Sequence, residues 1–206
     1  MYTVNKRQKR KRARERIRQD ISLSPMVITM IIISIYELVC NGENEILVKN
    51  IEEIIPCPKC ECELEYRDSR PRILRRYGGD KYFLIIRRLK CMGCSCVHTE
   101  LPDCLAPYKH YEIEVIENVI DEMITAENLE EDYPCESTMS RWKNWISKNT
   151  SNINGHMKSL GYRVLDLGIE LLRATSSILE LLQNEGEGWL GIILRVIYNS
   201  GHFLPA

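Results

Sequence analysis

The spacing of hydrophobic residues predicts strands in the first half of the chain. Residues 30–53 open with a run of β-branched isoleucines, which favours a buried strand followed by a short helical or turn segment. Two aromatic and β-branched runs, residues 72–77 and 81–90, lie on either side of the turn signal Gly78-Gly79-Asp80. Such runs around a glycine turn are typical of a β-hairpin.

From Tyr111 onward the period of the hydrophobic residues is helical. Apolar residues recur at steps of three and four through residues 111–124, which predicts an amphipathic helix. Further helices are expected near residues 126–132, over residues 137–148, and through the apolar runs 165–182 and 189–197. The second half of the chain is therefore predicted to be all-α.

These patterns predict an α+β protein with four parts. Residues 1–29 are a basic arm, expected to be disordered or a frayed helix, and residues 30–110 hold a strand and a ribbon domain that contains the hairpin. Residues 111–150 are expected to form a helix-turn-helix and residues 151–206 a C-terminal helical region. The composition, with 44% hydrophobic and 28% charged residues, is that of a globular protein rather than a disordered one.

The net charge of −1 is the sum of a basic N-terminal segment and an acidic remainder of the chain. Residues 1–29 carry a net charge of +7, which leaves −8 for residues 30–206, so no partner follows from the total alone. The apolar segment 25–40 is shorter than the roughly 20 residues that a spanning helix needs. The long charged segment before it is unlike a secretory signal, and we expect a cytoplasmic protein with no membrane contact.

Cysteine spacing points to a metal site. The pairs Cys57-Pro58-Lys59-Cys60 and Cys91-Met92-Gly93-Cys94 each place two thiols on one tight turn, and the hairpin between them can bring the two turns together. Four thiolates around one ion are the preferred ligand set of structural Zn²⁺. The sequence therefore predicts one structural zinc held by Cys57, Cys60, Cys91 and Cys94 in a zinc ribbon.

Three other interpretations of the cysteines stay open. The thiols could be reduced and unliganded, or the first pair could be a redox dithiol, although the βαβ pattern expected around such a dithiol is absent. Cys62 and Cys96 extend both turns to C-x-x-C-x-C, so six thiolates could hold two ions. We expect these two to be spare thiols, because four ligands saturate one zinc.

Basic residues suggest a nucleic-acid surface in two places. The hairpin carries many arginines, among them Arg75, Arg76, Arg87 and Arg88, which suit a phosphate backbone but also occur on solvated strands. The helix 137–148, which Ser137 can cap, places Met139, Trp142, Trp145 and Ile146 on one face. Arg141, Asn144 and Lys148 lie on another face with Lys143 nearby, as in a recognition helix, although an ordinary amphipathic helix has the same pattern.

Several strings of residues indicate a family resemblance more specifically than the spacing of hydrophobic residues does. They are Cys57-Pro58-x-Cys60, Ile85-Ile86-Arg87-Arg88-Leu89-x-Cys91-x-x-Cys94, Glu100-Leu101-Pro102-Asp103-x-Leu105-x-Pro107-Tyr108-Lys109-x-Tyr111, Asp132-Tyr133-Pro134-x-x-Ser137-Thr138-x-x-Arg141-Trp142-x-x-Trp145 and Tyr198-Asn199-Ser200-Gly201-His202-x-Leu204-Pro205. Through them the chain resembles, over residues 30–206, a bacterial family of unknown function whose members occur beside transposase genes. The resemblance implies a zinc ribbon followed by a helix-turn-helix, similar to the DNA-binding front ends of insertion-element transposases. It implies Cys57, Cys60, Cys91 and Cys94 as ligands and Arg141 as a recognition-helix residue, whereas Cys62, Cys96 and the arm 1–29 depart from the pattern.

The sequence thus favours a non-enzymatic, zinc-dependent protein that binds double-stranded DNA in a mobile element, as a targeting, end-binding or regulatory subunit. A P-loop, a G-x-S-x-G elbow and an H-E-x-x-H helix are all absent from the sequence, and we expect no small-molecule substrate. The alternative is an adaptor that docks on a transposase or its ATPase without touching DNA, which the acidic charge of residues 30–206 supports.

Overall fold

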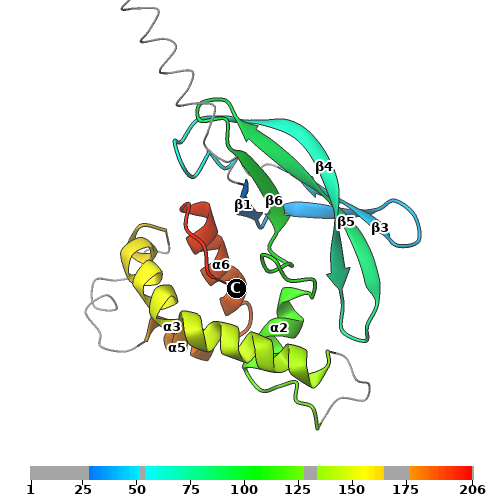
Figure 1. Ribbon diagram of the computed structural model, residues 1–206, viewed down its shortest axis with the longest axis vertical. Coiled ribbons are helices and arrows are strands. Elements are labelled where there is room, and N and C mark those ends of the chain that lie inside the picture. Colours follow the sequence, from blue (N-terminus) through cyan, green and yellow to red (C-terminus); the bar gives the residue numbers. More distant parts are fainter. Residues whose placement is uncertain (1–27, 52–53, 128–133, 165–176, 206) are drawn as a thin grey trace, which may run out of the picture.

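The computed structural model describes residues 28–51, 54–127, 134–164 and 177–205. In these ranges the chain is α+β, with a curled sheet at one end and four helices gathered at the other (Figure 1). The predicted arm and the helix expected near residues 126–132 lie wholly or largely outside the described residues.

The sheet has six strands. They are β1 (Ile28–Ile33), β2 (Tyr36–Cys40), β3 (Glu45–Asn50), β4 (Leu64–Arg75), β5 (Lys81–Cys91) and β6 (Val97–Pro102). Strand β5 lies at the centre, because β4 pairs antiparallel along its whole length while β3 and β6 share its other side. β1 is parallel to β6, and β2 forms a hairpin with β3.

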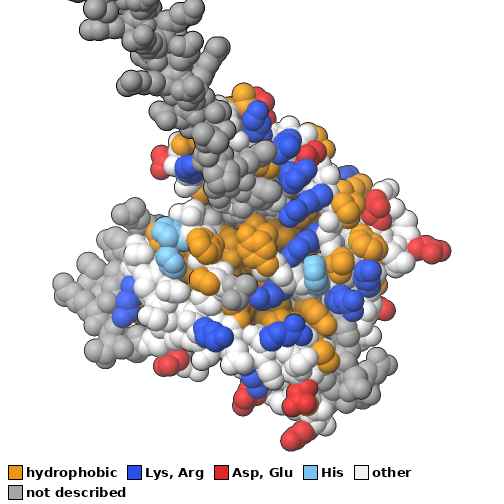
Figure 2. Space-filling model, in the orientation of Figure 1, with side chains coloured by type: hydrophobic (Ala, Val, Ile, Leu, Met, Phe, Trp, Pro, Cys, Tyr) orange, Lys and Arg blue, Asp and Glu red, His pale blue; other side chains and the backbone are white. Residues whose placement is uncertain are grey.

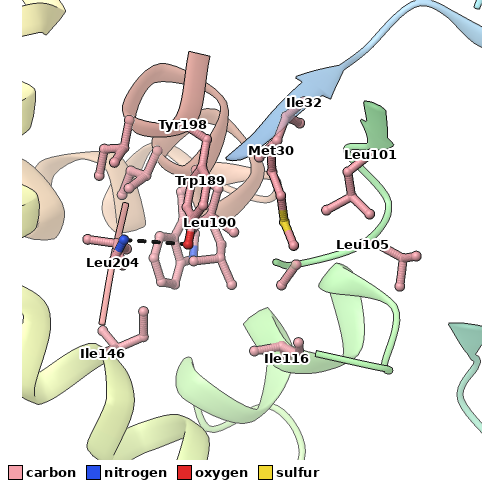
Figure 3. Close-up of a cluster of buried hydrophobic side chains, with 14 of the residues drawn as sticks. Met30, Ile32, Leu101, Leu105, Ile116, Ile146, Trp189, Leu190, Tyr198 and Leu204 are labelled. Carbon is pink, nitrogen blue, oxygen red and sulfur yellow. Dashed lines mark hydrogen bonds between the residues drawn. The ribbon is translucent and has the colours of Figure 1, made fainter. Parts of the chain in front are cut away.

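The described helices are α2 (Ile113–Ile120), α3 (Glu136–Val164), α5 (Ile178–Glu185) and α6 (Trp189–Asn199). Helix α6 joins the two halves of the molecule, because it packs against both β1 and α3. Trp189, Leu190 and Tyr198 of α6 face Met30 and Ile32 of β1 in the buried cluster, with Ile116 of α2 and Ile146 of α3 on the helical side (Figure 3). The apolar periodicity that predicts these elements therefore supplies one continuous core.

The hairpin predicted around Gly78 is confirmed, since β4 and β5 pair from Arg75 opposite Lys81 to Leu64 opposite Cys91. It is part of the larger sheet rather than a separate ribbon domain. The single strand predicted near residues 30–53 is instead three strands, because Ser34 and the turn at residues 41–44 break the run. The described part of β1 starts at Ile28, and the predicted arm before it lies outside the described residues.

Helix α3 is much longer than the predicted 137–148. Its 29 residues begin at Glu136, so Ser137 lies in the first turn instead of capping the helix. The buried stripe continues beyond Ile146 through Asn149, Ile153 and Met157, all close to fully buried. Serine, threonine and asparagine are frequent in this second half and lower intrinsic helix propensity, and packing against the core overrides that preference.

A side-chain clamp joins the last described helix, α6, to strand β1. The Asn199 side chain accepts a hydrogen bond from the Ile32 N–H (2.7 Å) and donates one to the Ile32 carbonyl (2.8 Å). Asn199 thus satisfies two backbone groups of β1, which lies at the end of the strand order. No helix in the described part of the chain is long and apolar enough to cross a membrane.

Candidate metal centre and basic groove

The two predicted cysteine turns have the same backbone structure. In the first, Cys57 N–H donates to the Cys62 carbonyl and Glu61 N–H to the Cys57 carbonyl, at 3.0 and 2.8 Å. In the second, Cys91 N–H donates to the Cys96 carbonyl and Ser95 N–H to the Cys91 carbonyl, at 2.9 and 3.1 Å. Glu61 and Ser95 both adopt a left-handed backbone, with φ of 60° and 59°. Two equivalent turns therefore face each other where β4 begins and β5 ends.

The four predicted ligand sulfurs converge. The Sγ atoms of Cys57, Cys60, Cys91 and Cys94 all lie within 4.8 Å of one another. Cys57 and Cys94 are 3.6 Å apart and Cys60 and Cys91 are 3.4 Å apart, sulfur to sulfur. A tetrahedral ion with ligand bonds of about 2.3 Å holds its sulfurs roughly 3.8 Å apart, whereas a disulfide needs about 2.05 Å. These four cysteines could hold a metal ion.

The pKa shifts of Cys57 and Cys60 follow from the places of their sulfurs in this group. Burial raises the pKa of the Cys57 thiol to about 12, against the effect of the Lys59 and Cys60 N–H groups that point at its sulfur. The backbone N–H of Cys62 and the Cys91 side chain lower the pKa of Cys60. A cation among the sulfurs would favour the thiolate form at each of them.

A buried histidine supports the site from outside the sulfur group. His98 Nε2 lies 3.3 Å from Cys57 Sγ, and His98 Nδ1 is hydrogen-bonded to the Thr29 hydroxyl. Burial lowers the pKa of His98, so the neutral ring can accept from Thr29 and donate from Nε2 to sulfur. This is the outer-shell orientation that metal ligands commonly receive.

Cys62 and Cys96 lie outside the four-sulfur group. Their carbonyls accept the N–H groups of Cys57 and Cys91, so each closes its turn through the backbone. A Cβ at Gly93 would come within 2.5 Å of the Cys62 sulfur, and only glycine fits there. The geometry therefore agrees with a single four-cysteine site.

A groove of about 520 Å³ lies between α3 and the segment that follows β6. One wall is the outer face of α3, with the predicted residues Arg141, Asn144 and Lys148, and the other is the segment 108–111. All the side chains that line it are basic, aromatic or uncharged polar. Figure 2 shows Lys and Arg side chains in a band that crosses this face of the molecule beside exposed hydrophobic side chains.

The groove residues are held in place by their neighbours. Arg141 lies along its own helix, where Nε donates to the Ser137 carbonyl at 3.0 Å and Nη2 to the Thr138 hydroxyl at 3.1 Å. Lys109 Nζ lies 4.3 Å from the centre of the Trp145 ring, and burial lowers the pKa of Lys109. The structure gives Lys109, Arg141 and Lys148 no ion pair with any residue that it describes.

Three of the four predicted arginines of the hairpin, Arg76, Arg87 and Arg88, have carboxylate partners instead. Arg87 forms two hydrogen bonds with Glu100, and Arg88 forms two with Asp68. Arg76 lies 3.7 Å from the Glu112 carboxylate and over the Tyr82 ring. Lys143 on α3 is likewise paired, 3.0 Å from Glu122. Because each of these cations is already paired with a carboxylate, it would attract a phosphate less strongly.

The end of β4 supports the groove through its backbone and one arginine. Arg72 Nη2 donates to the Lys109 carbonyl at 2.9 Å. Arg75 N–H donates to the His110 carbonyl at 2.7 Å, and Glu112 N–H donates to the Arg75 carbonyl at 2.9 Å. The hairpin therefore fixes the wall that carries Lys109.

Sequence reasoning missed Tyr108, Lys109 and His110 as groove residues, although Tyr108 and Lys109 belong to the string Pro107-Tyr108-Lys109-x-Tyr111. The helix-turn-helix stays a prediction. Residues 128–133, between α2 and α3, lie outside the described residues.

Part of the chain matches the model of a known family. Residues 57–142 match the model of a domain of unknown function, DUF6431. The match begins at the first cysteine ligand and ends within α3, so it takes in the four-sulfur group and most of the groove. No curated protein and no solved structure matches the chain.

Proposed function

We propose that the protein is a non-enzymatic DNA-binding protein with one structural Zn²⁺, acting in a mobile element as an end-binding, targeting or regulatory subunit. The observation that carries the proposal is the groove between α3 and residues 108–111. It combines cationic side chains that lack carboxylate partners in the described chain with aromatic rings. Phosphate backbones are bound by such cations, and this contact dominates affinity for DNA.

Zinc is the proposed ion because four thiolates in a tetrahedral, closed arrangement are its structural ligand set. The ion supplies no reaction in this proposal. It holds two turns together that otherwise meet only through a few hydrogen bonds, and so fixes the ends of β4, β5 and β6.

Binding to DNA is tested by titrating the full chain against a duplex pool while salt is raised. We expect Arg141→Ala to weaken binding to all sequences and to lower the salt slope by about 1 if Arg141 contacts phosphate. If Arg141 contacts a base, the loss is about 1–3 kcal/mol at one preferred site only.

Lys143→Ala is the matched control on the same helix, because Lys143 is already paired with Glu122. A folded Arg141→Ala variant that binds as well as the wild type would contradict the proposal.

The second candidate is an adaptor that docks on a transposase or its ATPase. The acidic residues of and after α2 favour it, since Glu114, Asp121 and Glu122 are exposed and suit a basic partner surface. Absence of salt-sensitive DNA binding by a folded, metal-loaded chain would favour the adaptor.

A further inference from the structure

The groove contains a strained and exposed tyrosine. Tyr108 has a backbone φ of 61°, in the left-handed region that bulky residues avoid. Its side chain is 57% exposed, which is high for a large aromatic residue. Backbone strain of this kind concentrates at binding and catalytic sites, because folding alone does not select it.

The other tyrosine and tryptophan rings of the groove already contact neighbouring residues. Tyr111 packs edge-on against Trp142, with ring centres 4.7 Å apart. Trp145 is covered by Lys109 on one side, and its Nε1 donates to the Pro205 carbonyl at 2.8 Å. Among the tyrosine and tryptophan side chains of the groove, Tyr108 is therefore the one that is exposed to meet a ligand, and the His110 side chain near it is exposed as well.

The shape of the site argues against a base pair as its occupant. A recognition helix must project from the surface to enter a major groove about 12 Å wide. Arg141, Asn144 and Lys148 instead stand in the wall of a concave groove of about 520 Å³. Pockets of roughly 300–1,000 Å³ enclose ligands of small-molecule size, a range that includes a single nucleotide.

We propose that the groove holds one unpaired nucleotide of the DNA, with its base stacked on Tyr108 and its phosphate beside Lys109 and Arg141. The inference rests on the proposed DNA binding and adds the class of DNA: a duplex that carries an unpaired nucleotide, as at a frayed or overhanging end. A base in a duplex is stacked on both faces by its neighbours, so only an unpaired base offers a free face to Tyr108. Stacking of this kind is tolerant of sequence, because every base has a π face.

The test compares three DNA probes with the same label by fluorescence anisotropy: a blunt duplex, the same duplex with a three-nucleotide overhang, and the single strand. We expect the wild-type protein to bind the overhang probe about 5-fold or more tightly than the blunt duplex, the contribution expected of one stacked base.

Tyr108→Leu should abolish that preference, whereas Tyr108→Phe should keep it. Tyr77→Leu is the matched control, since Tyr77 is equally exposed, at 57%, but lies in the hairpin turn. Lys109→Gln should weaken binding to the overhang probe, and Lys158→Gln, at an exposed position further along α3, should not.

Failure of the nucleotide pocket and failure of the DNA-binding proposal give different results in this test. Equal wild-type affinity for the blunt and overhang probes, or a preference that survives Tyr108→Leu, would overturn the nucleotide pocket and leave the DNA-binding proposal standing. No binding to any of the three probes by folded, metal-loaded protein would overturn both.

Discussion

Arg87 and Arg88 are neighbours on one strand, yet they have different surroundings. Arg87 donates to Glu100 through Nε and Nη2 at 2.6 and 2.7 Å, and the Glu100 side chain is only 4% exposed. Arg88 makes the equivalent bidentate contact with Asp68, whose side chain is 36% exposed. Removing one partner of a buried ion pair leaves an unpaired charge out of water, whereas an exposed carboxylate is solvated again.

We therefore expect Arg87→Met to lower the free energy of unfolding by about 3 kcal/mol, because only the Asn50 amide would still donate to Glu100. Arg88→Met is the matched control and should cost much less. Urea denaturation followed by circular dichroism measures both. Equal losses in the two variants would show that burial of Glu100 does not decide the energetics of the pair.

The site predictions from the sequence succeed where they depend on local features of the chain. The convergence of Cys57, Cys60, Cys91 and Cys94 is confirmed, because their spacing and the hairpin are local features. The roles of the arginines depend on Asp68 and Glu100, which lie on β4 and β6 beside β5. No local pattern gives that pairing. The strain at Tyr108 is equally invisible, since periodicity carries no information on φ.

At the scale of elements, the sheet and the helices are joined by few polar contacts, and Asn199 makes two of them. The string Tyr198-Asn199-Ser200-Gly201 predicted similarity to a family but no structural role. In the fold Asn199 pairs with both backbone groups of Ile32, and the Tyr198 hydroxyl accepts from the Leu204 N–H at 3.4 Å (Figure 3). The order of the strands, with β1 beside β6, could not be predicted because this pairing is parallel and separated by more than sixty residues.

Asn199→Ala should lower the free energy of unfolding by about 2 kcal/mol, since it leaves the Ile32 N–H and carbonyl without their partner. Asn199→Asp keeps an acceptor for the N–H and sets a carboxylate against the carbonyl, so it should be no better than alanine. Hydrogen exchange of the Ile32 amide by NMR provides a local readout, and protection that persists in Asn199→Ala would contradict the clamp.

At the scale of the whole molecule, the four-sulfur group and the groove are linked through the C-terminal segment. A Cβ at Gly201 would lie 3.0 Å from the Pro58 carbonyl of the first cysteine turn, so the chain after α6 lies directly against that turn. Four residues later, the Pro205 carbonyl accepts from Trp145 Nε1 and from the Asn149 amide, at 2.8 and 3.0 Å. Lys109 in turn lies over the Trp145 ring. The segment thus connects the sulfur cluster to the floor of the groove.

Removal of the proposed zinc should therefore weaken the proposed DNA binding, even though no cysteine lines the groove. Without an ion the first turn loses its closure, Pro58 loses its fixed position against Gly201, and Pro205 holds Trp145 less firmly. We expect a chelator to lower both the melting temperature and the affinity for the overhang probe, and added Zn²⁺ to restore them. Cys91→Ser should behave as the chelated protein does, and elemental analysis should give one zinc per wild-type chain.

Gly201→Ala separates the effect of the C-terminal segment from global unfolding, because it disturbs the contact with Pro58 while all four cysteines remain. If that variant keeps its zinc and loses affinity, the C-terminal segment carries the coupling, whereas unchanged affinity in a folded Gly201→Ala protein would contradict it.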